Sequence, residues 1–250
     1  MIFMGGIKVN INSENYDDEA TLTGTIGETA LIPVKNEIVR NKFVERIERY
    51  SKRAIDILGG LVGTLCLIPL TIFIYIANRL QGDKGPIFYS QDRIGKNGKL
   101  FRMYKYRSMV VGADDILKEY LEQNEEARKE YKKNKKLKND PRITKIGAFI
   151  RKTSLDEFPQ FINVLKGEMS MVGPRPYLPR EKEDMGSYYT CITKCKPGVT
   201  GFWQVNGRSD VDFAERLNMD LIYYNEKSFK NDLKIIIRTI KNLVKKEGAI

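Results

Sequence analysis

An uncharged run at residues 57–78 limits the folds open to this chain more than any other feature. The run is apolar and long enough to cross a bilayer core as a helix, which needs about 20 residues. It begins too far into the chain for a secretory signal and lacks a clear cleavage pattern. The alternative, a helix buried inside a soluble core, is rarely so long and so free of charge. We therefore expect a membrane segment.

Pro69 lies inside this run and predicts a kink or a break, because proline lacks an N–H and collides with the carbonyl four residues earlier. Each half is then only about 14–18 Å long at 1.5 Å per residue, too short to cross alone. The two shapes that remain are a kinked spanning helix and a re-entrant hairpin that returns to the same face. Basic residues lie on both sides, within 40–53 and at Arg79 and Lys84. Because positive flanks favour the cytoplasmic side, we favour the proline-broken re-entrant shape.

The remaining chain predicts an α+β fold that is mostly helical, with one small β-hairpin. Asn97-Gly98 between two alternating runs is typical of a hairpin turn and puts the hairpin near 87–109. The charged stretch 112–138 predicts a helix, either a solvated face or a polybasic patch attracted to anionic lipid. Apolar and basic residues alternate at helical spacing over 233–246, which predicts an amphipathic helix that packs on the domain or lies in the membrane interface.

Three parts follow along the chain. Residues 1–36 are polar and weakly patterned, and we expect a flexible leader. Residues 37–84 are expected to form a basic helix and the re-entrant membrane segment. Residues 85–250 are expected to form a cytosolic catalytic domain that ends in the amphipathic helix.

The composition removes several kinds of chemistry. The chain has no histidine, which excludes a Ser-His-Asp triad, a Cys-His pair, histidine-ligated zinc and a histidine base. Its three cysteines are too few for a four-ligand metal site, and their odd number fits a reducing compartment. A disulfide between Cys191 and Cys195 remains an alternative. A net charge of +11 indicates anionic partners such as phosphorylated substrates, lipid headgroups or nucleic acid.

Two adjacent carboxylates, Asp156 and Glu157, follow closely on Arg151. The structural interpretation is a capping box, in which Ser154 and Glu157 cap a helix, although Pro159 counts slightly against an ordinary helix here. In the chemical interpretation, the helix dipole and the nearby cation keep Asp156 ionised, so that it can attack phosphorus. Glu157 would then be free to hold a metal.

Arginines and one further acid complete the candidate site. Arg175 stands between two prolines in a stiff turn, which suits a phosphate clamp, and a glycine turn presents Arg208. Trp203 is interpreted as a core or interface residue in preference to a sugar-stacking platform. Asp220 is an acid among apolar residues, either a satisfied structural carboxylate or a metal ligand.

As a set, these features resemble the bacterial sugar transferase family, the monotopic phosphoglycosyl transferases that use polyprenyl phosphate. The likeness covers about residues 45–248 and includes the proline-interrupted apolar segment and the Asp220 segment. The other matching motifs are PIFYSQDRIG, FRMYKYRSM, NDPRITKIGAFIRKTSLDEFPQ, NVLKGEMSMVGPRP and KPGVTGFWQVNGR. Ile68 stands where family members often have a polar residue before the proline, and the absence of preceding membrane helices suggests a short form.

The resemblance implies a transfer in two steps. Asp156 would attack the sugar-bearing phosphorus of a UDP-sugar and release UMP, and polyprenyl phosphate would then take the phosphosugar from Asp156. Glu157, together with Asp220, would hold Mg²⁺. The arginines would receive phosphate oxygens; they are Arg151, Arg175 and Arg208. The 112–145 stretch resembles that of hexose-1-phosphate transferases, which favours UDP-galactose or UDP-glucose as donor.

The expected partners are therefore a UDP-sugar, undecaprenyl or a related polyprenyl phosphate, the cytoplasmic face of a bacterial membrane and, as an open alternative, a second copy in a homodimer. Two alternatives remain for the function. One keeps the substrates but uses a direct, Mg²⁺-assisted transfer, and the other is a non-enzymatic basic adaptor on the membrane surface. A nucleic-acid binder is not expected, because the hydrophobic segment has no place in it.

Overall fold

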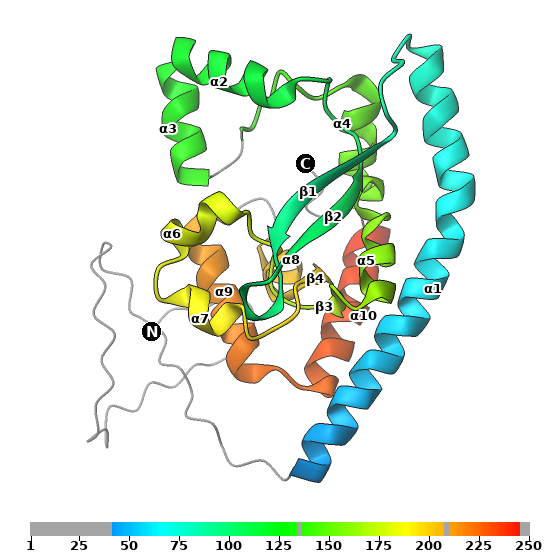
Figure 1. The fold of residues 1–250 in the computed structure, drawn as a ribbon, viewed down its shortest axis with the longest axis vertical. Coiled ribbons are helices and arrows are strands. Elements are labelled where there is room, and N and C mark those ends of the chain that lie inside the picture. Colours follow the sequence, from blue (N-terminus) through cyan, green and yellow to red (C-terminus); the bar gives the residue numbers. More distant parts are fainter. Residues whose placement is uncertain (1–41, 135–136, 208–210, 246–250) are drawn as a thin grey trace.

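The computed structural model describes residues 42–134, 137–207 and 211–245, and the predicted leader 1–36 lies outside these ranges. The described chain is mostly helical and has two small two-stranded sheets, which confirms the predicted fold class (Figure 1). Its α-helices are α1 (Lys42–Leu80), α2 (Ala113–Gln123), α3 (Glu125–Asn134), α4 (Lys145–Lys152), α5 (Gln160–Lys166), α6 (Lys182–Met185), α7 (Tyr188–Ile192), α8 (Phe202–Asn206), α9 (Phe213–Glu226) and α10 (Phe229–Lys245). The strands and 3₁₀ helices are β1 (Phe88–Ile94), β2 (Leu100–Tyr106), β3 (Ser170–Val172), β4 (Gly198–Thr200), η1 (Lys96–Gly98), η2 (Leu155–Glu157) and η3 (Pro179–Glu181).

The long helix α1 corrects one prediction, because it runs through Pro69 as a single helix and does not break into a hairpin. Contacts on both sides of the proline hold the helix to the body. The Tyr106 hydroxyl is 2.6 Å from Thr71 Oγ1 and donates to the carbonyl of Leu67 at 3.3 Å. The cost of one missing backbone bond is therefore offset by packing along the whole helix.

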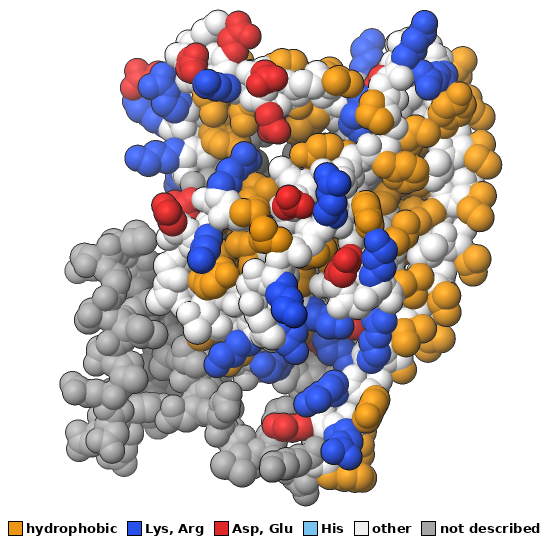
Figure 2. Space-filling view, viewed as in Figure 1, with side chains coloured by type: hydrophobic (Ala, Val, Ile, Leu, Met, Phe, Trp, Pro, Cys, Tyr) orange, Lys and Arg blue, Asp and Glu red, His pale blue; other side chains and the backbone are white. Residues whose placement is uncertain are grey.

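One face of α1 is buried against the body, and the opposite face is exposed and apolar. Gly63 lies on the buried face, where an added Cβ would sit 2.2 Å from the ring of Phe161 on α5, so only glycine allows this approach. In Figure 2, apolar side chains line the outer edge of α1. The largest of those exposed within the uncharged run are Ile57, Leu58, Leu61, Val62, Leu65, Ile68, Ile72, Phe73, Tyr75 and Ile76.

The predicted hairpin is confirmed, with β1 and β2 paired antiparallel. Asn97 and Gly98 both have positive φ, at 58° and 76°, which is the backbone that an Asn-Gly turn provides. The register puts Tyr89 opposite Lys105 and Arg93 opposite Phe101. Because side chains alternate across a strand, Tyr89, Arg93 and Lys105 share one face of the hairpin.

The described residues of the stretch 112–138 do not form the charged helix that the sequence predicted. They form α2 and α3, separated at Asn124, whose side chain accepts from the backbone N–H of Ala127 at 3.0 Å and so caps α3. In Figure 1 this pair lies on the opposite side of the body from α1. That position favours a solvated charged face over a lipid-binding patch.

The helix predicted near the C-terminus is also present, as α10, which packs against α1, α8 and the β3–β4 pair. Ile235 is buried, whereas Leu233, Ile237 and Ile240 are exposed. Helix α10 is therefore amphipathic, with one face on the body and an apolar strip left open.

Candidate active site

Asp156 and Glu157 lie in η2, a short turn between α4 and α5. Ser154, before this turn, has a φ of 57°, a left-handed conformation that is uncommon for a residue other than glycine. The Ser154 side chain makes no capping hydrogen bond, so the capping box that offered a structural explanation for Glu157 is not formed. The two carboxylates therefore sit on a sharply turned segment and not in the first turn of an α-helix.

Lys105, on β2, joins the two carboxylates. Its Nζ lies 2.8 Å from Glu157 Oε1 and 3.8 Å from Asp156 Oδ2. The Asp156 side chain is 10% exposed and that of Glu157 is 33% exposed, so Glu157 is the more accessible of the pair. Lys105 was not predictable from the sequence, because nothing in the motif FRMYKYRSM distinguishes this lysine from the other lysines of the chain.

The two carboxyl groups differ in acidity. Burial raises the pKa of Asp156 to about 6, and the positive charge of Lys105 limits the rise. Burial also acts to raise the pKa of Glu157, but the charge and hydrogen bond of Lys105, together with the charge of Arg175 and a hydrogen bond from Gln160, outweigh it, so that this pKa is lowered. Arg151 also favours the ionised form of Asp156, as expected, but Lys105 is the larger stabilising charge, and Asp156 does not lie in the first turn of an α-helix. Asp156 is still mostly ionised at pH 7.

Arg151, near the end of α4, contributes a second cation close to Asp156. Its Nε donates to Ser108 Oγ at 2.8 Å, which fixes the guanidinium group. The positive charge of Arg151 lowers the pKa of Asp156, although less than Lys105 does. Arg151 thus acts on Asp156 as a nearby cation, as the sequence predicted.

The loop that carries Arg175 is held by close backbone contacts. Gly173 donates from its N–H to the carbonyl of Thr200 at 3.0 Å, and Gly198 donates to the carbonyl of Pro174 at 2.9 Å. A Cβ on Gly198 would lie 2.1 Å from the Gly173 nitrogen, so glycine is required where the two segments meet. The motifs VGPRP and KPGVTG, far apart in sequence, therefore build one rigid loop.

Asp220, on α9, supports the same loop from behind. It is fully buried, and its Oδ2 accepts from the backbone N–H of Arg175 at 3.0 Å and from the Tyr177 hydroxyl at 2.8 Å. Its Oδ1 is buried and has no hydrogen-bond partner among the described residues. Burial raises the pKa of Asp220 to about 7 in spite of these two bonds. This environment matches the structural interpretation of Asp220 more closely than that of an open metal ligand.

Two further arginines, Arg93 and Arg216, lie beside Arg175, and the sequence analysis assigned neither. The guanidinium carbons of Arg175 and Arg216 lie 5.6 and 5.9 Å from the ring centre of Trp203. Burial, followed by the charge of Arg175, lowers the pKa of both Arg93 and Arg216 to about 10. Trp203 is half-buried and contacts both arginines through its ring.

The structure therefore brings together Asp156, Glu157, Arg151 and Arg175, and it puts Asp220 behind the Arg175 loop. Arg208 lies outside the described residues. Glu157 fits a magnesium ligand, because Mg²⁺ is commonly held by one or two carboxylates and substrate phosphates. Among the described residues, however, no group of three acidic or cysteine side chains gathers to hold a metal.

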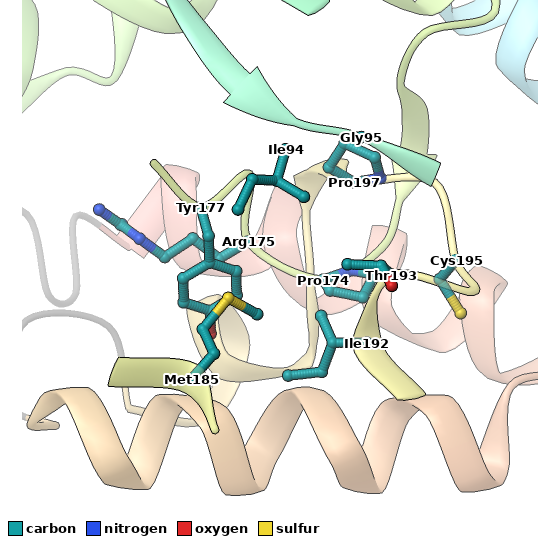
Figure 3. Close-up of a pocket in the computed structure, with 10 residues that line it drawn as sticks. All are labelled: Ile94, Gly95, Pro174, Arg175, Tyr177, Met185, Ile192, Thr193, Cys195 and Pro197. Atoms are coloured by element: carbon teal, nitrogen blue, oxygen red, sulfur yellow. The ribbon is translucent and has the colours of Figure 1, made fainter. Parts of the chain in front are cut away.

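A small pocket lies beneath the Arg175 loop, and neither Asp156 nor Glu157 lines it. Ile94, Tyr177, Met185 and Ile192 line it, together with parts of the loop itself. Figure 3 shows the Arg175 side chain directed away from the pocket. The pocket therefore belongs to the support of the loop, and the carboxylates lie elsewhere.

The sequence of this chain is similar to known proteins over most of its length. The model of the family described as bacterial sugar transferase matches residues 47–246. The chain is 44% identical over 211 residues to the undecaprenyl-phosphate galactose phosphotransferase of Salmonella typhimurium, covering 84% of this chain and 44% of that protein. It is 39% identical over 206 residues to the exopolysaccharide production protein ExoY of Rhizobium meliloti, covering 82% of this chain and 91% of that protein.

A third relative is the UDP-glucose:undecaprenyl-phosphate glucose-1-phosphate transferase of Escherichia coli, which is 39% identical over 202 residues, covering 78% of this chain and 40% of that protein. The chain thus spans less than half the length of the Salmonella and Escherichia relatives. The similar region of all three includes most of the described residues.

Proposed function

We propose, because this chain belongs to the bacterial sugar transferase family, that it transfers a sugar 1-phosphate from a UDP-sugar to undecaprenyl phosphate. The names of the Salmonella and Escherichia relatives support the reaction and the acceptor, and the name of the Rhizobium relative supports a role in exopolysaccharide production. The higher identity to the galactose enzyme favours UDP-galactose, with UDP-glucose as the alternative donor.

In the first step, an oxygen of ionised Asp156 attacks the phosphorus that carries the sugar. A bond forms between Asp156 and this phosphorus, the bond from the phosphorus to the UMP oxygen breaks, and UMP leaves with that electron pair. No base is needed, because most of the nucleophile is ionised at neutral pH. Lys105 and Arg151 neutralise charge on the phosphoryl group beside Asp156.

In the second step, an oxygen of undecaprenyl phosphate attacks the same phosphorus. The bond to Asp156 breaks, the carboxylate is regenerated, and the product is an undecaprenyl diphosphate sugar. The acceptor phosphate is already ionised near pH 7, so this step also needs no histidine. A chain without histidine can therefore catalyse both steps.

Glu157 is the carboxylate that would hold Mg²⁺, since it is the exposed member of the pair and its pKa is lowered. A bound Mg²⁺ neutralises the diphosphate and the charge that develops on the departing UMP. Lys105 donates to Glu157 in the structure and keeps its carboxylate ionised and oriented. We assign Asp220 to supporting the Arg175 loop.

The membrane arrangement follows from the contacts of α1. Near one end of the helix Arg53 donates to the carbonyls of Val164 and Leu165, and beyond the middle Thr71 bonds to Tyr106. A helix that crossed the bilayer would carry these parts of the body into lipid. We therefore propose that α1 inserts sideways by its apolar face, with both ends and the active site on the cytoplasmic side.

The observation that carries the proposal is the contact of one lysine with two adjacent carboxylates, set among arginines. The test is to incubate the full chain, in membranes, with undecaprenyl phosphate and a panel of UDP-sugars that carry ³²P in the sugar-bearing phosphate. We expect the label to move to the lipid fraction with UDP-galactose or UDP-glucose. Absence of labelled lipid with every donor would overturn the proposed function.

A further inference from the structure

Arg175 and Arg216 both lie over the ring of Trp203, and Arg93 donates to Pro176, the residue after Arg175. Arg216 is buried and the other two are half-buried, and the three lack a matching set of negative charges. None of Arg93, Arg175 and Arg216 forms a salt bridge with a carboxylate of the described residues. The acids whose charges act on these arginines accept hydrogen bonds from other donors. Glu157 accepts from Lys105, and Asp212 accepts from the backbone N–H of Glu215. Glu181 accepts from the backbone N–H of Leu178 at 2.7 Å, and Asp220 accepts from Tyr177 and the Arg175 backbone.

Buried donors in the same region also lack acceptors. The Nε of Arg93, the Nε of Arg175 and the Nε1 of Trp203 are buried and have no hydrogen-bond partner among the described residues. An unpaired buried donor costs about 1–3 kcal/mol, and a charged one costs more. Three such donors, together with excess positive charge, are typical of a site that binds an anion.

The charged groups have an order along the site. Lys105 contacts both Glu157 and Asp156, and Arg151 lies beside Asp156. Arg93 shares the face of the hairpin with Lys105 but lies nearer the turn, and it donates to the carbonyl of Pro176, next to Arg175. Arg175 and Arg216 both lie over the ring of Trp203. The order therefore runs from Arg151 and Asp156, through Lys105 and Glu157, to Arg175 and its two neighbours.

The diphosphate of the donor would lie along this row of charged side chains. If the sugar-bearing phosphorus is beside Asp156, the second phosphate lies farther along, past Glu157 and toward the three arginines. Arginine suits this task, because its planar group donates to two phosphate oxygens at once.

On the basis of the proposed function, we propose that Arg93 and Arg216, together with Arg175, bind the nucleotide-side phosphate of the donor, which becomes the phosphate of UMP. Backbone carbonyls fix both side chains. Arg93 donates to Pro176 at 2.9 Å, and Arg216 donates to Asp212 at 3.1 Å and to Asn134 at 2.8 Å. Each guanidinium group has five N–H donors, so these bonds leave donors for a phosphate.

If Arg93 and Arg216 had a purely structural role, replacing them would weaken the binding of ligands with and without the phosphate equally. The test compares UMP with uridine, which differ only in that group. Calorimetry on the full chain in nanodiscs measures the dissociation constant of each ligand for the wild type and for Arg93→Gln and Arg216→Gln. The matched control is Arg102→Gln, since Arg102 is 71% exposed on the other face of the hairpin.

We expect the wild type and the control to bind UMP more tightly than uridine. Each of the two variants should lose at least tenfold in UMP affinity, with uridine affinity unchanged within twofold. Equal losses for both ligands, or an unchanged preference for UMP, would overturn the inference. If a glutamine variant fails to fold, Arg93→Lys and Arg216→Lys keep the charge and should show a smaller loss of the same preference.

Release of UMP from a UDP-sugar by the wild type separates this inference from the proposed function. If UMP is released and the variants keep their preference for UMP, only the assignment of Arg93 and Arg216 is wrong. If the wild type neither releases UMP nor prefers it to uridine, the proposed function fails and the inference fails with it.

Discussion

Lys105 Nζ lies 2.8 Å from Glu157 Oε1 and 3.8 Å from Asp156 Oδ2, so one cation from the hairpin serves two adjacent carboxylates. Two carboxylates this close disfavour each other's ionised form, and the lysine offsets that effect. Through Lys105, the hairpin therefore influences the charge state of Asp156, the candidate nucleophile.

Replacing Lys105 by methionine should slow UMP release at pH 7 by at least tenfold. Burial raises the pKa of Asp156 to about 6, and Lys105 is the largest influence that lowers it. Without this lysine the pKa rises further, so less of the nucleophile is ionised. The pH profile of UMP release under single-turnover conditions checks this. The wild-type rate should rise as the pH rises through about 6, and the variant should reach half its maximum at a higher pH.

Lys99→Met is the control, because Lys99 is an exposed residue at the turn of the same hairpin. It should leave both the rate and the profile unchanged. A Lys105→Met variant with a slower rate but an unshifted profile would show that Lys105 acts on substrate and not on Asp156.

Asp220→Asn should change how stability depends on pH. Burial raises the pKa of Asp220 in the folded state to about 7, above its ordinary value near 3.8, so folding favours the protonated carboxyl. This contribution to stability is complete below about pH 4 and is lost as the pH rises through about 7. Asparagine resembles the neutral acid at every pH, so the variant should gain in melting temperature relative to the wild type between pH 5 and pH 8.

The comparison is made by thermal unfolding of both proteins in the same detergent across this pH range. If the difference in melting temperature between the two proteins does not vary with pH, the buried carboxyl of Asp220 does not titrate near neutrality, and the explanation is wrong. Asp212→Asn is not a suitable control, since Asp212 caps α9. Asp92→Asn is suitable, because the Asp92 side chain is 60% exposed.

Gly63→Ala should loosen the contact between α1 and α5. The new Cβ would meet the Phe161 ring at 2.2 Å, and overpacking of this kind costs roughly 1–3 kcal/mol. Chemical unfolding measures the loss. Gly59→Ala is the control, because its nearest neighbour is the flexible end of Met171, and the change there should be smaller. Phe161→Leu in the Gly63→Ala background should recover part of the stability, and no recovery would contradict the steric explanation.

Both ends of α1 should lie on the cytoplasmic side of the membrane. Single cysteines are introduced at Tyr50 and at Leu80, which are 69% and 83% exposed, in a chain whose three native cysteines are replaced by serine. A membrane-impermeant maleimide should label neither position in intact cells and both after permeabilisation. Labelling of one position in intact cells would show that α1 spans the bilayer.

The sequence predicted those parts of the fold that depend on local signals. Asn97-Gly98 predicted the hairpin turn, and the helical spacing of apolar and basic residues over 233–246 predicted the amphipathic helix α10. The effect of Pro69 was not predictable in the same way, because tertiary contacts decide whether a proline breaks a helix. Thr71 and Tyr106 supply one such contact.

The candidate site was predictable where motifs concentrate charge, as at Asp156 and Arg175. Lys105, Arg93 and Arg216 were not, because each enters the site through strand register or helix packing between distant segments. Asp220 illustrates the same limit. Its isolation among apolar residues allowed both a structural and a metal-binding interpretation, and only its bonds to Tyr177 and Arg175 favour the former.

The central claim is that Asp156 carries the phosphosugar between donor and acceptor. Intact-protein mass spectrometry of the full chain, incubated with UDP-galactose or UDP-glucose and Mg²⁺ but without undecaprenyl phosphate, tests it most directly. We expect an added mass equal to one hexose phosphate on the chain, which digestion of the same sample assigns to the peptide that contains Asp156. The adduct should be released on addition of undecaprenyl phosphate, and Asp156→Asn should show none. Efficient lipid product formation by the wild type with no adduct, or by the Asp156→Asn variant, would contradict the claim and favour direct transfer.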